Sequence, residues 1–181
     1  DNTASGRDAL RSNTTGFFNT ASGLNALFSN TTGSDNTASG ALALFSNTTG
    51  FSNTASGRDA LYSNTTGDDN TASGTAALLF NTTGSNNTAS GQDALFSNTT
   101  GSNNIALGNR SGFNLTTGDN NIMIGNEGVA GEAGIIRLGT TGTHTETHLV
   151  GTVFTPSGTV TTSSRRFKEG IQPLQDVSHG L

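Results

Sequence analysis

Apolar side chains recur along this chain every 17 residues, and Asn, Thr, Ser and Gly fill most positions between them. Each copy begins with Asn-Thr-Ala-Ser-Gly, continues with a segment containing Ala and Leu, and ends with Asn-Thr-Thr-Gly, as in residues 19–35. A strict period of this length indicates that each copy is one structural unit stacked on its neighbours. The copies start, without insertion and with altered residues in the last two, at Asn2, Asn19, Asn36, Asn53, Asn70, Asn87, Asn104 and Asn121.

Within one copy, Asn-Thr-Ala-Ser-Gly predicts a brief strand and a turn, followed by a second short segment and a closing glycine turn. A helix is excluded because Gly, Asn and Thr recur too often for it to propagate. Parallel stacking pairs each segment with the same segment of the next copy. The predicted fold is therefore all-β, a parallel β-solenoid of 17-residue rungs over residues 1–120, each rung adding about 4.8 Å.

Equivalent positions in the copies form columns, and the most apolar column is the predicted core. It consists of Leu10, Leu27, Leu44, Leu61, Leu78 and Leu95. Beside it lies a mostly aromatic column that includes Phe28 and Phe45, which we expect to be partly exposed or in a subunit contact. The first Asn of each copy is expected to form an amide ladder along the axis. The glycines of both turns are expected to have positive φ.

The composition limits the classes of function. The formal charge of −5 argues against nucleic acid or anionic membrane as partners. The chain has no Cys, which removes thiolate metal sites and thiol nucleophiles, and no cofactor is expected. No apolar run is long enough to span a bilayer. Because the chain opens inside a repeat, we expect its true N-terminus to precede residue 1.

A coil of this length encloses little more than one Leu and two Ala, which is a small core for a lone solenoid. Oligomerisation is the usual remedy, so we expect a homotrimer with a shared axis, an arrangement that also permits fibres to join end to end. Near the end of the repeat, aliphatic residues replace the Thr and Ser of the strand, which predicts a dry contact between subunits. They are Ile105, Leu107, Ile122 and Ile124. Residues 121–155 are expected to form a terminal apolar rung with short capping strands.

Two stretches resemble known families. Residues 104–108 and 121–125, Asn-Ile-Ala-Leu-Gly and Asn-Ile-Met-Ile-Gly, resemble the strand motif of the YadA-like β-roll head of trimeric autotransporter adhesins, a family that repeats at about fourteen residues. Residues 163–174 resemble the opening of the peptidase S74 family, the intramolecular chaperone domain of phage tailspikes and endosialidases. That second resemblance implies a C-terminal segment, here 156–181, that drives trimerisation and in many members is released by self-cleavage just before a Ser. A Ser and a Lys are implicated in that cleavage, and the matching positions here are Ser163 and Lys168. Because the chain stops at Leu181, we expect a linker there and no catalysis.

The predicted function is therefore structural: the shaft or head of a trimeric extracellular fibre of phage tail-fibre or adhesin type, on a cell surface or virion. It would space or present a surface that binds a glycan or receptor. Variable turn residues are the candidate contacts, although such turns also vary when nothing constrains them. They include Phe17, Phe18, Phe51, Arg58, Asp59, Gln92 and Asp93.

Other readings remain open. The outward Thr-x-Ser rank favours an ice-binding solenoid as the alternative. A carbohydrate-active enzyme is less favoured because no carboxylate pair recurs at a defined position. His144, Glu146 and His148 alternate along one predicted strand, either as a metal triad or as a solvated face. Asn-Thr-Thr also forms glycosylation acceptors unless the Asn instead supports turn backbones. The acceptor positions are Asn13, Asn30, Asn47, Asn64, Asn81 and Asn98.

Overall fold

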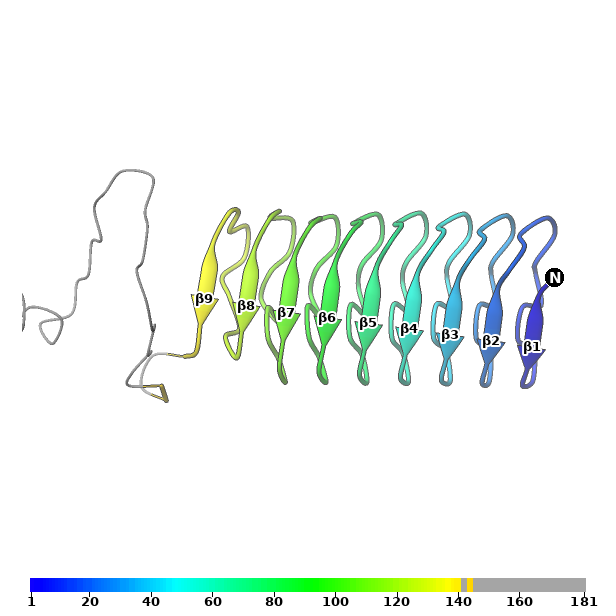
Figure 1. Ribbon diagram of the computed structural model, residues 1–181, viewed down its shortest axis with the longest axis horizontal. Helices are drawn as coiled ribbons and strands as arrows, with labels where there is room; N and C mark the ends of the chain where they lie inside the picture. The colour runs from blue at the N-terminus through cyan, green and yellow to red at the C-terminus, as the bar shows by residue number, and fades with distance from the viewer. Residues whose placement is uncertain (141–142, 145–181) are drawn as a thin grey trace, which may run out of the picture. The chain divides into compact units, whose positions relative to one another are not determined.

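The computed structural model describes residues 1–140, 143 and 144, and these residues form one coiled stack of short strands with no helix among them (Figure 1). All the strands lie in a single nine-stranded sheet, in chain order. They are β1 (Thr3–Ser5), β2 (Thr20–Ser22), β3 (Thr37–Ser39), β4 (Thr54–Ser56), β5 (Thr71–Ser73), β6 (Thr88–Ser90), β7 (Ile105–Leu107), β8 (Ile122–Ile124) and β9 (Ile136–Leu138). The predicted all-β parallel solenoid is confirmed.

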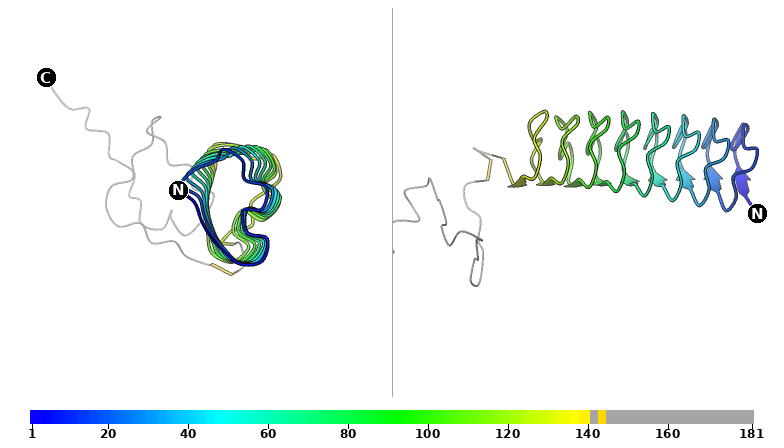
Figure 2. Two further views of the ribbon diagram at one scale, coloured as in Figure 1. Left: turned by 90° about the vertical axis from the view of Figure 1, so that its right-hand side faces the viewer. Right: turned by 90° about the horizontal axis from the view of Figure 1, so that it is seen from above.

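Each strand pairs in parallel with the same segment of the next rung, so that Thr20 lies opposite Thr37. The coils therefore superimpose when viewed along the axis (Figure 2). The last step is shorter, because Ile122 pairs with Ile136, 14 residues further along the chain. One of the expected capping strands is therefore present as β9. The second was expected over residues 143–151, of which the structure describes only Thr143 and His144.

The second segment of each rung is a turn and not a strand. Leu27 adopts a φ of 51°, in the left-handed region, which no strand residue occupies. The backbone groups of this turn still pair with the next rung, since Leu27 N donates to Ala43 O (3.0 Å) and Ser29 N donates to Phe45 O (3.0 Å). Each coil is thus held on its neighbours by hydrogen bonds on several sides, although only one side is a sheet.

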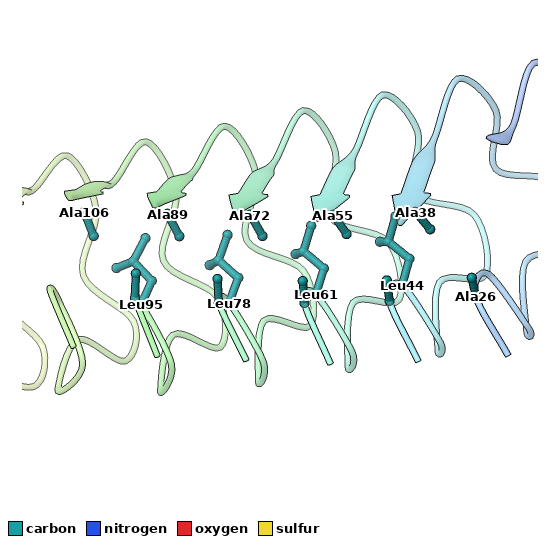
Figure 3. Packing of buried hydrophobic residues seen from close by; sticks show 14 of the residues in the cluster. Ala26, Ala38, Leu44, Ala55, Leu61, Ala72, Leu78, Ala89, Leu95 and Ala106 are labelled. Carbon is teal, nitrogen blue, oxygen red and sulfur yellow. The ribbon is translucent and has the colours of Figure 1, made fainter. Parts of the chain in front are cut away.

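The core is a narrow double row in which Leu side chains of the turns face the central Ala residues of the strands (Figure 3). Leu27, Leu44, Leu61, Leu78 and Leu95 are fully buried, and Leu10 is partly buried. The row changes at the C-terminal end, where Gly112 occupies the Leu column. Leu115 and Met123, which come from other columns, are fully buried there. A larger residue at position 112 would collide with Leu95, because a Cβ would lie 2.8 Å from Leu95 Cδ2.

Two ladders of buried Asn side chains run along the stack. In the expected ladder, Asn36 Nδ2 donates to Asn19 Oδ1 (3.1 Å) and to Gly50 O (2.8 Å). In the second ladder, Asn47 Nδ2 donates to Asn30 Oδ1 (2.8 Å) and also to Gly50 O (2.9 Å). These bonds satisfy polar groups that would otherwise be costly to bury.

The glycines of the two turns are required for different reasons. Gly23 and its equivalents after the strands have positive φ, 141° at Gly23, as predicted. The prediction is wrong for the closing turns, because Gly33 and its equivalents do not have positive φ. Glycine is needed there because a Cβ on Gly33 would collide with Gly50 O and with Asn30 Oδ1. Close stacking of the Asn ladder on the turn leaves no space for a side chain.

Candidate functional site

The outer face of the sheet presents two ranks of hydroxyls. In each inner strand the central Ala points into the core and the flanking Thr and Ser point outward, so that Thr20 and Ser22 are exposed while Ala21 is buried. This alternation follows from the two-residue period of a strand. The in-register pairing repeats it from β2 to β6. The Thr-x-Ser rank expected from the sequence therefore lies at the surface.

The same face becomes aliphatic over the last three strands. We call the outward residues of β7 to β9 the aliphatic patch; these side chains are exposed except for Ile122, which is half-buried. Ile136 is the most exposed of them, at 66%. The patch consists of Ile105, Leu107, Ile122, Ile124, Ile136 and Leu138. A contiguous exposed apolar surface of this kind marks an interaction site.

The candidate turn residues fall into two separate groups. Phe17 and Phe18 precede β2 and are 51% and 64% exposed, with their rings edge to face at 5.2 Å. Arg58 and Asp59, and likewise Gln92 and Asp93, follow the strands β4 and β6, so the structure places them at the other end of the strands. Arg58 Nε lies 3.2 Å from Asp59 Oδ2, and Gln92 Nε2 donates to Asp93 Oδ2 (3.2 Å). These polar side chains are paired locally.

The turn before β4 contains a further exposed phenylalanine. Phe51 occupies the same column as Phe17 and is 47% exposed. Side chains of the following rung accept the amide protons of both residues: Ser34 Oγ accepts from Phe17 N (3.1 Å), and Asp68 Oδ1 accepts from Phe51 N (2.9 Å). The period of the repeat relates Phe51 to Phe17, because it places Phe51 two rungs further along the same column.

The aromatic column beside the Leu core is half-buried, and its rings stack on one another. The Phe28 and Phe45 centroids lie 5.2 Å apart, and those of Phe45 and Tyr62 lie 5.1 Å apart, with nearly parallel planes. The Arg11 guanidinium lies over Phe28, 5.5 Å from its centroid, which is a cation–π distance. Because their faces contact each other, these rings offer mainly edges to a partner.

The six glycosylation acceptors are the residues of the second Asn ladder. From Asn30 to Asn98 their side chains are fully buried, and each side-chain nitrogen donates to the preceding Asn and to a turn glycine, as Asn64 Nδ2 does to Asn47 Oδ1 and Gly67 O. A glycan on that nitrogen would have to break both bonds and open the rung. The structure therefore places these Asn residues in the turn-supporting role. Asn13, in the first rung, is half-buried.

The metal hypothesis involves residues at the edge of the described part of the chain. His144 Nδ1 accepts a hydrogen bond from Thr140 N (2.9 Å), whereas Glu146 and His148 lie outside the described residues. Within residues 1–140, 143 and 144, no group of His, Asp or Glu is arranged to hold a metal ion. Ser163 and Lys168 also lie outside the described residues.

One ion pair closes the short last coil. Arg137 Nε donates to Glu132 Oε2 (3.0 Å), and Val129 N also donates to that oxygen (3.1 Å). The hydrogen bond from Arg137 holds the pKa of Glu132 below its ordinary value of 4.5, opposed by partial burial and helped by Val129. The same pair raises the pKa of Arg137. A charged clamp thus joins β9 to the loop before it.

Comparison with protein-family models found no match, and searches among curated proteins and among solved structures found no significant similarity. In the described part of the chain, no helix has the length and apolar character needed to cross a membrane. The geometry of the exposed surfaces therefore provides the basis for assigning a function.

Proposed function

We propose that the chain is a rigid segment of a homotrimeric extracellular fibre, located on a cell surface or virion, which spaces or presents a receptor-binding surface. The observation that supports this proposal most is the aliphatic patch on β7 to β9. Along the same sheet, the register and the buried central residue are maintained from β6 to β7, and only the outward residues change from Thr and Ser to Ile and Leu. Within the strand the change is limited to the outer face, where it leaves Ile and Leu side chains in contact with water unless a partner covers them.

A partner would remove the patch from water. Burial of apolar surface contributes roughly 25 cal/mol for each Å², so several exposed Ile and Leu side chains offer a substantial driving force for association. A second and third copy of the chain supply identical patches, which suits closed cyclic symmetry. The narrow core, which is one Leu and two Ala wide in most rungs, gives the lone coil a further reason to associate.

The resemblances noted in the sequence agree with this role. Two of the three strands of the patch, β7 and β8, are the segments that resemble the head strands of trimeric adhesins. The last coil, from Ile122 to Ile136, spans 14 residues, which is the repeat length of that family. We propose no catalytic function, and the tail over residues 156–181 would serve assembly.

Native mass spectrometry of the full chain tests the proposal. We expect a trimer for the natural sequence. Replacing four of the six patch residues by the residues of earlier rungs, through Ile105→Thr, Leu107→Ser, Ile122→Thr and Ile124→Ser, should yield a folded monomer. The matched control is Phe80→Ser, which restores the repeat residue at another exposed apolar position and should leave the trimer intact. A monomeric natural chain, or a trimer that survives the four changes, would contradict the proposal.

A second candidate function is ice binding. It is favoured by the ranks of exposed Thr and Ser hydroxyls from β2 to β6, which parallel pairing places at one regular spacing on a rigid sheet. If this function holds, the chain will show thermal hysteresis, and Thr54→Lys in the middle of the rank will abolish it. Absence of hysteresis in the natural chain eliminates this candidate.

A further inference from the structure

Two exposed phenylalanines lie in one line along the rod. Phe17 and Phe51 occupy the same column of the turn before each strand, two rungs apart, and are 51% and 47% exposed. Because neighbouring rungs are separated by the spacing of paired strands, the two backbones lie about 10 Å apart. The line from one ring to the other therefore runs along the solenoid axis.

The structure fixes the backbone of both phenylalanines and the ring of Phe17. Phe18 packs edge to face on Phe17, with an interplanar angle of 87°. The amides of Phe17 and Phe51 are fixed by Ser34 Oγ and Asp68 Oδ1 of the following rungs. Ser34, which separates the two phenylalanines in the column, is only 8% exposed, whereas Ser85 and Ser102 at equivalent positions are half-buried. The flanking rings thus shelter Ser34 and form the two ends of a short platform.

The carboxylate of Asp35 lies in the same turn as this platform. Asp35 follows Ser34 and is exposed, and its φ of 59° places it on the same tight turn. The two columns of this turn, from residue 17 to residue 120, contain no Lys or Arg and contain four Asp residues, which are Asp35, Asp68, Asp69 and Asp119. This edge of the rod is therefore acidic, and it repels anionic ligands.

We propose that Phe17, Asp35 and Phe51 form a binding site for a neutral, unbranched glycan that lies along the rod. The rings would stack on the apolar C–H faces of two sugar units, and the Asp35 carboxylate would accept hydrogen bonds from sugar hydroxyls, which are stronger when the acceptor is charged. Two rings separated by a small polar residue match the repeating sugar units of a glycan. A protein partner would instead favour a contiguous apolar patch. The inference goes beyond the proposed structural role and does not depend on the oligomeric state.

Isothermal titration calorimetry of the full chain with neutral β-linked hexasaccharides, a glucan and an N-acetylglucosamine oligomer, tests the site. We expect binding to at least one of them and none to a polygalacturonate oligomer of equal length. The double change Phe17→Ala and Phe51→Ala should raise the Kd about tenfold or more, because two stacking surfaces are lost. Asp35→Asn should weaken binding less, since the amide retains one acceptor oxygen.

The matched control is Phe80→Ala. Phe80 is equally exposed, at 46%, but lies in another column, where it packs on the edge of Phe96 at 5.0 Å. This change should leave the Kd unchanged. Circular dichroism will show whether each variant retains the fold, as expected for exposed positions. The proposal is overturned if neither neutral oligomer binds, if the acidic oligomer binds equally well, or if Phe80→Ala weakens binding as much as the double change.

Discussion

At the scale of single residues, the last Asn of the second ladder makes fewer hydrogen bonds than the Asn residues in its middle, so the two kinds can be compared. Asn98 Nδ2 donates to Asn81 Oδ1 (2.9 Å), but Asn98 Oδ1 has no partner, because Leu115 stands at the next position of the column. Asn64, in the middle, makes the same bonds as a donor, and its Oδ1 also accepts from Asn81 Nδ2 (2.8 Å). The two residues therefore differ by one buried hydrogen bond.

We predict that Asn64→Ala lowers the free energy of unfolding by about 3 kcal/mol, because it leaves Asn47 Oδ1 and one Asn81 N–H buried without partners. Asn98→Ala should cost at least about 1 kcal/mol less, since no donor is orphaned and an unsatisfied oxygen is removed. Urea unfolding followed by circular dichroism measures both changes. Equal losses for the two variants would show that the ladder bonds do not contribute to stability.

A second residue-scale prediction concerns backbone strain. Ala76 has a φ of 57°, in the left-handed region that costs a non-glycine residue roughly 1–2 kcal/mol. Ala76→Gly should therefore raise the free energy of unfolding by about 1 kcal/mol. The neighbouring Ala77 is fully buried and its φ is not positive, so Ala77→Gly should destabilise the protein instead, through greater chain entropy and a lost core methyl. Thermal unfolding of both variants should give shifts of opposite sign.

At the scale of elements, the period predicts the strands well and the turns less well. Asn-Thr-Ala-Ser-Gly alternates as a strand with one buried face must, and the strands lie where the sequence places them. The segment around Leu27 is apolar enough for a strand, yet it is a turn, because the narrow coil has to reverse direction there. A Leu residue does not predict a left-handed conformation, which glycine and Asn adopt far more readily. Tertiary packing selects it.

The last coil supports a prediction about pH. Because Arg137 lowers the pKa of folded Glu132 below 4.5, the stabilisation from this pair is present above the unfolded pKa. It is lost as the pH falls through the folded-state pKa. Below about pH 4.5 we expect the Ile122 and Gly139 amides, which donate to Ile135 O (2.9 Å) and Ile124 O (2.8 Å), to lose hydrogen-exchange protection.

Exchange measured by NMR and normalised to the intrinsic rate at each pH tests this, with the Thr37 amide in β3 as an internal reference. Glu132→Gln should show the reduced protection already at neutral pH. Glu127→Gln breaks the exposed pair with Arg110 (2.8 Å) and should leave β9 protected. Loss of protection in all strands together at low pH would mean that the clamp is not the acid-sensitive element.

At the scale of the whole molecule, the stacking of rungs explains which features of the candidate site could be predicted from the sequence. Phe17 and Phe18 stand out where most rungs have Ser, Asp or Asn, so their exposure was predictable. Their relation to Phe51 depends on the in-register stack. The same register makes the Asn-Thr-Thr motifs poor glycan acceptors, because it buries each Asn against the next. The motif alone does not show whether the side-chain nitrogen of its Asn already donates hydrogen bonds to a neighbouring rung.

The in-register stack also predicts how the molecule tolerates deletion. Each rung contacts mainly its two neighbours, so stability is approximately a sum of rung and interface contributions. Removing residues 54–70 deletes one 17-residue period and brings β3 beside β5 with both Asn ladders intact. We expect a folded rod with the same strand signal per residue and only a small decrease in the urea midpoint.

Removing residues 54–69, one residue fewer, leaves an extra Asn between β3 and β5. A one-residue slip exchanges the inward and outward faces of a strand, so one half of the stack would have to bulge or present Thr in place of Ala to the core. We expect this variant to unfold at a far lower urea concentration, or in two separate transitions as the two halves uncouple. Circular dichroism and urea titration compare the pair directly. Equal midpoints for the two deletions would mean that the rungs are held by the sheet face alone, without contribution from the register of the Asn and Leu columns.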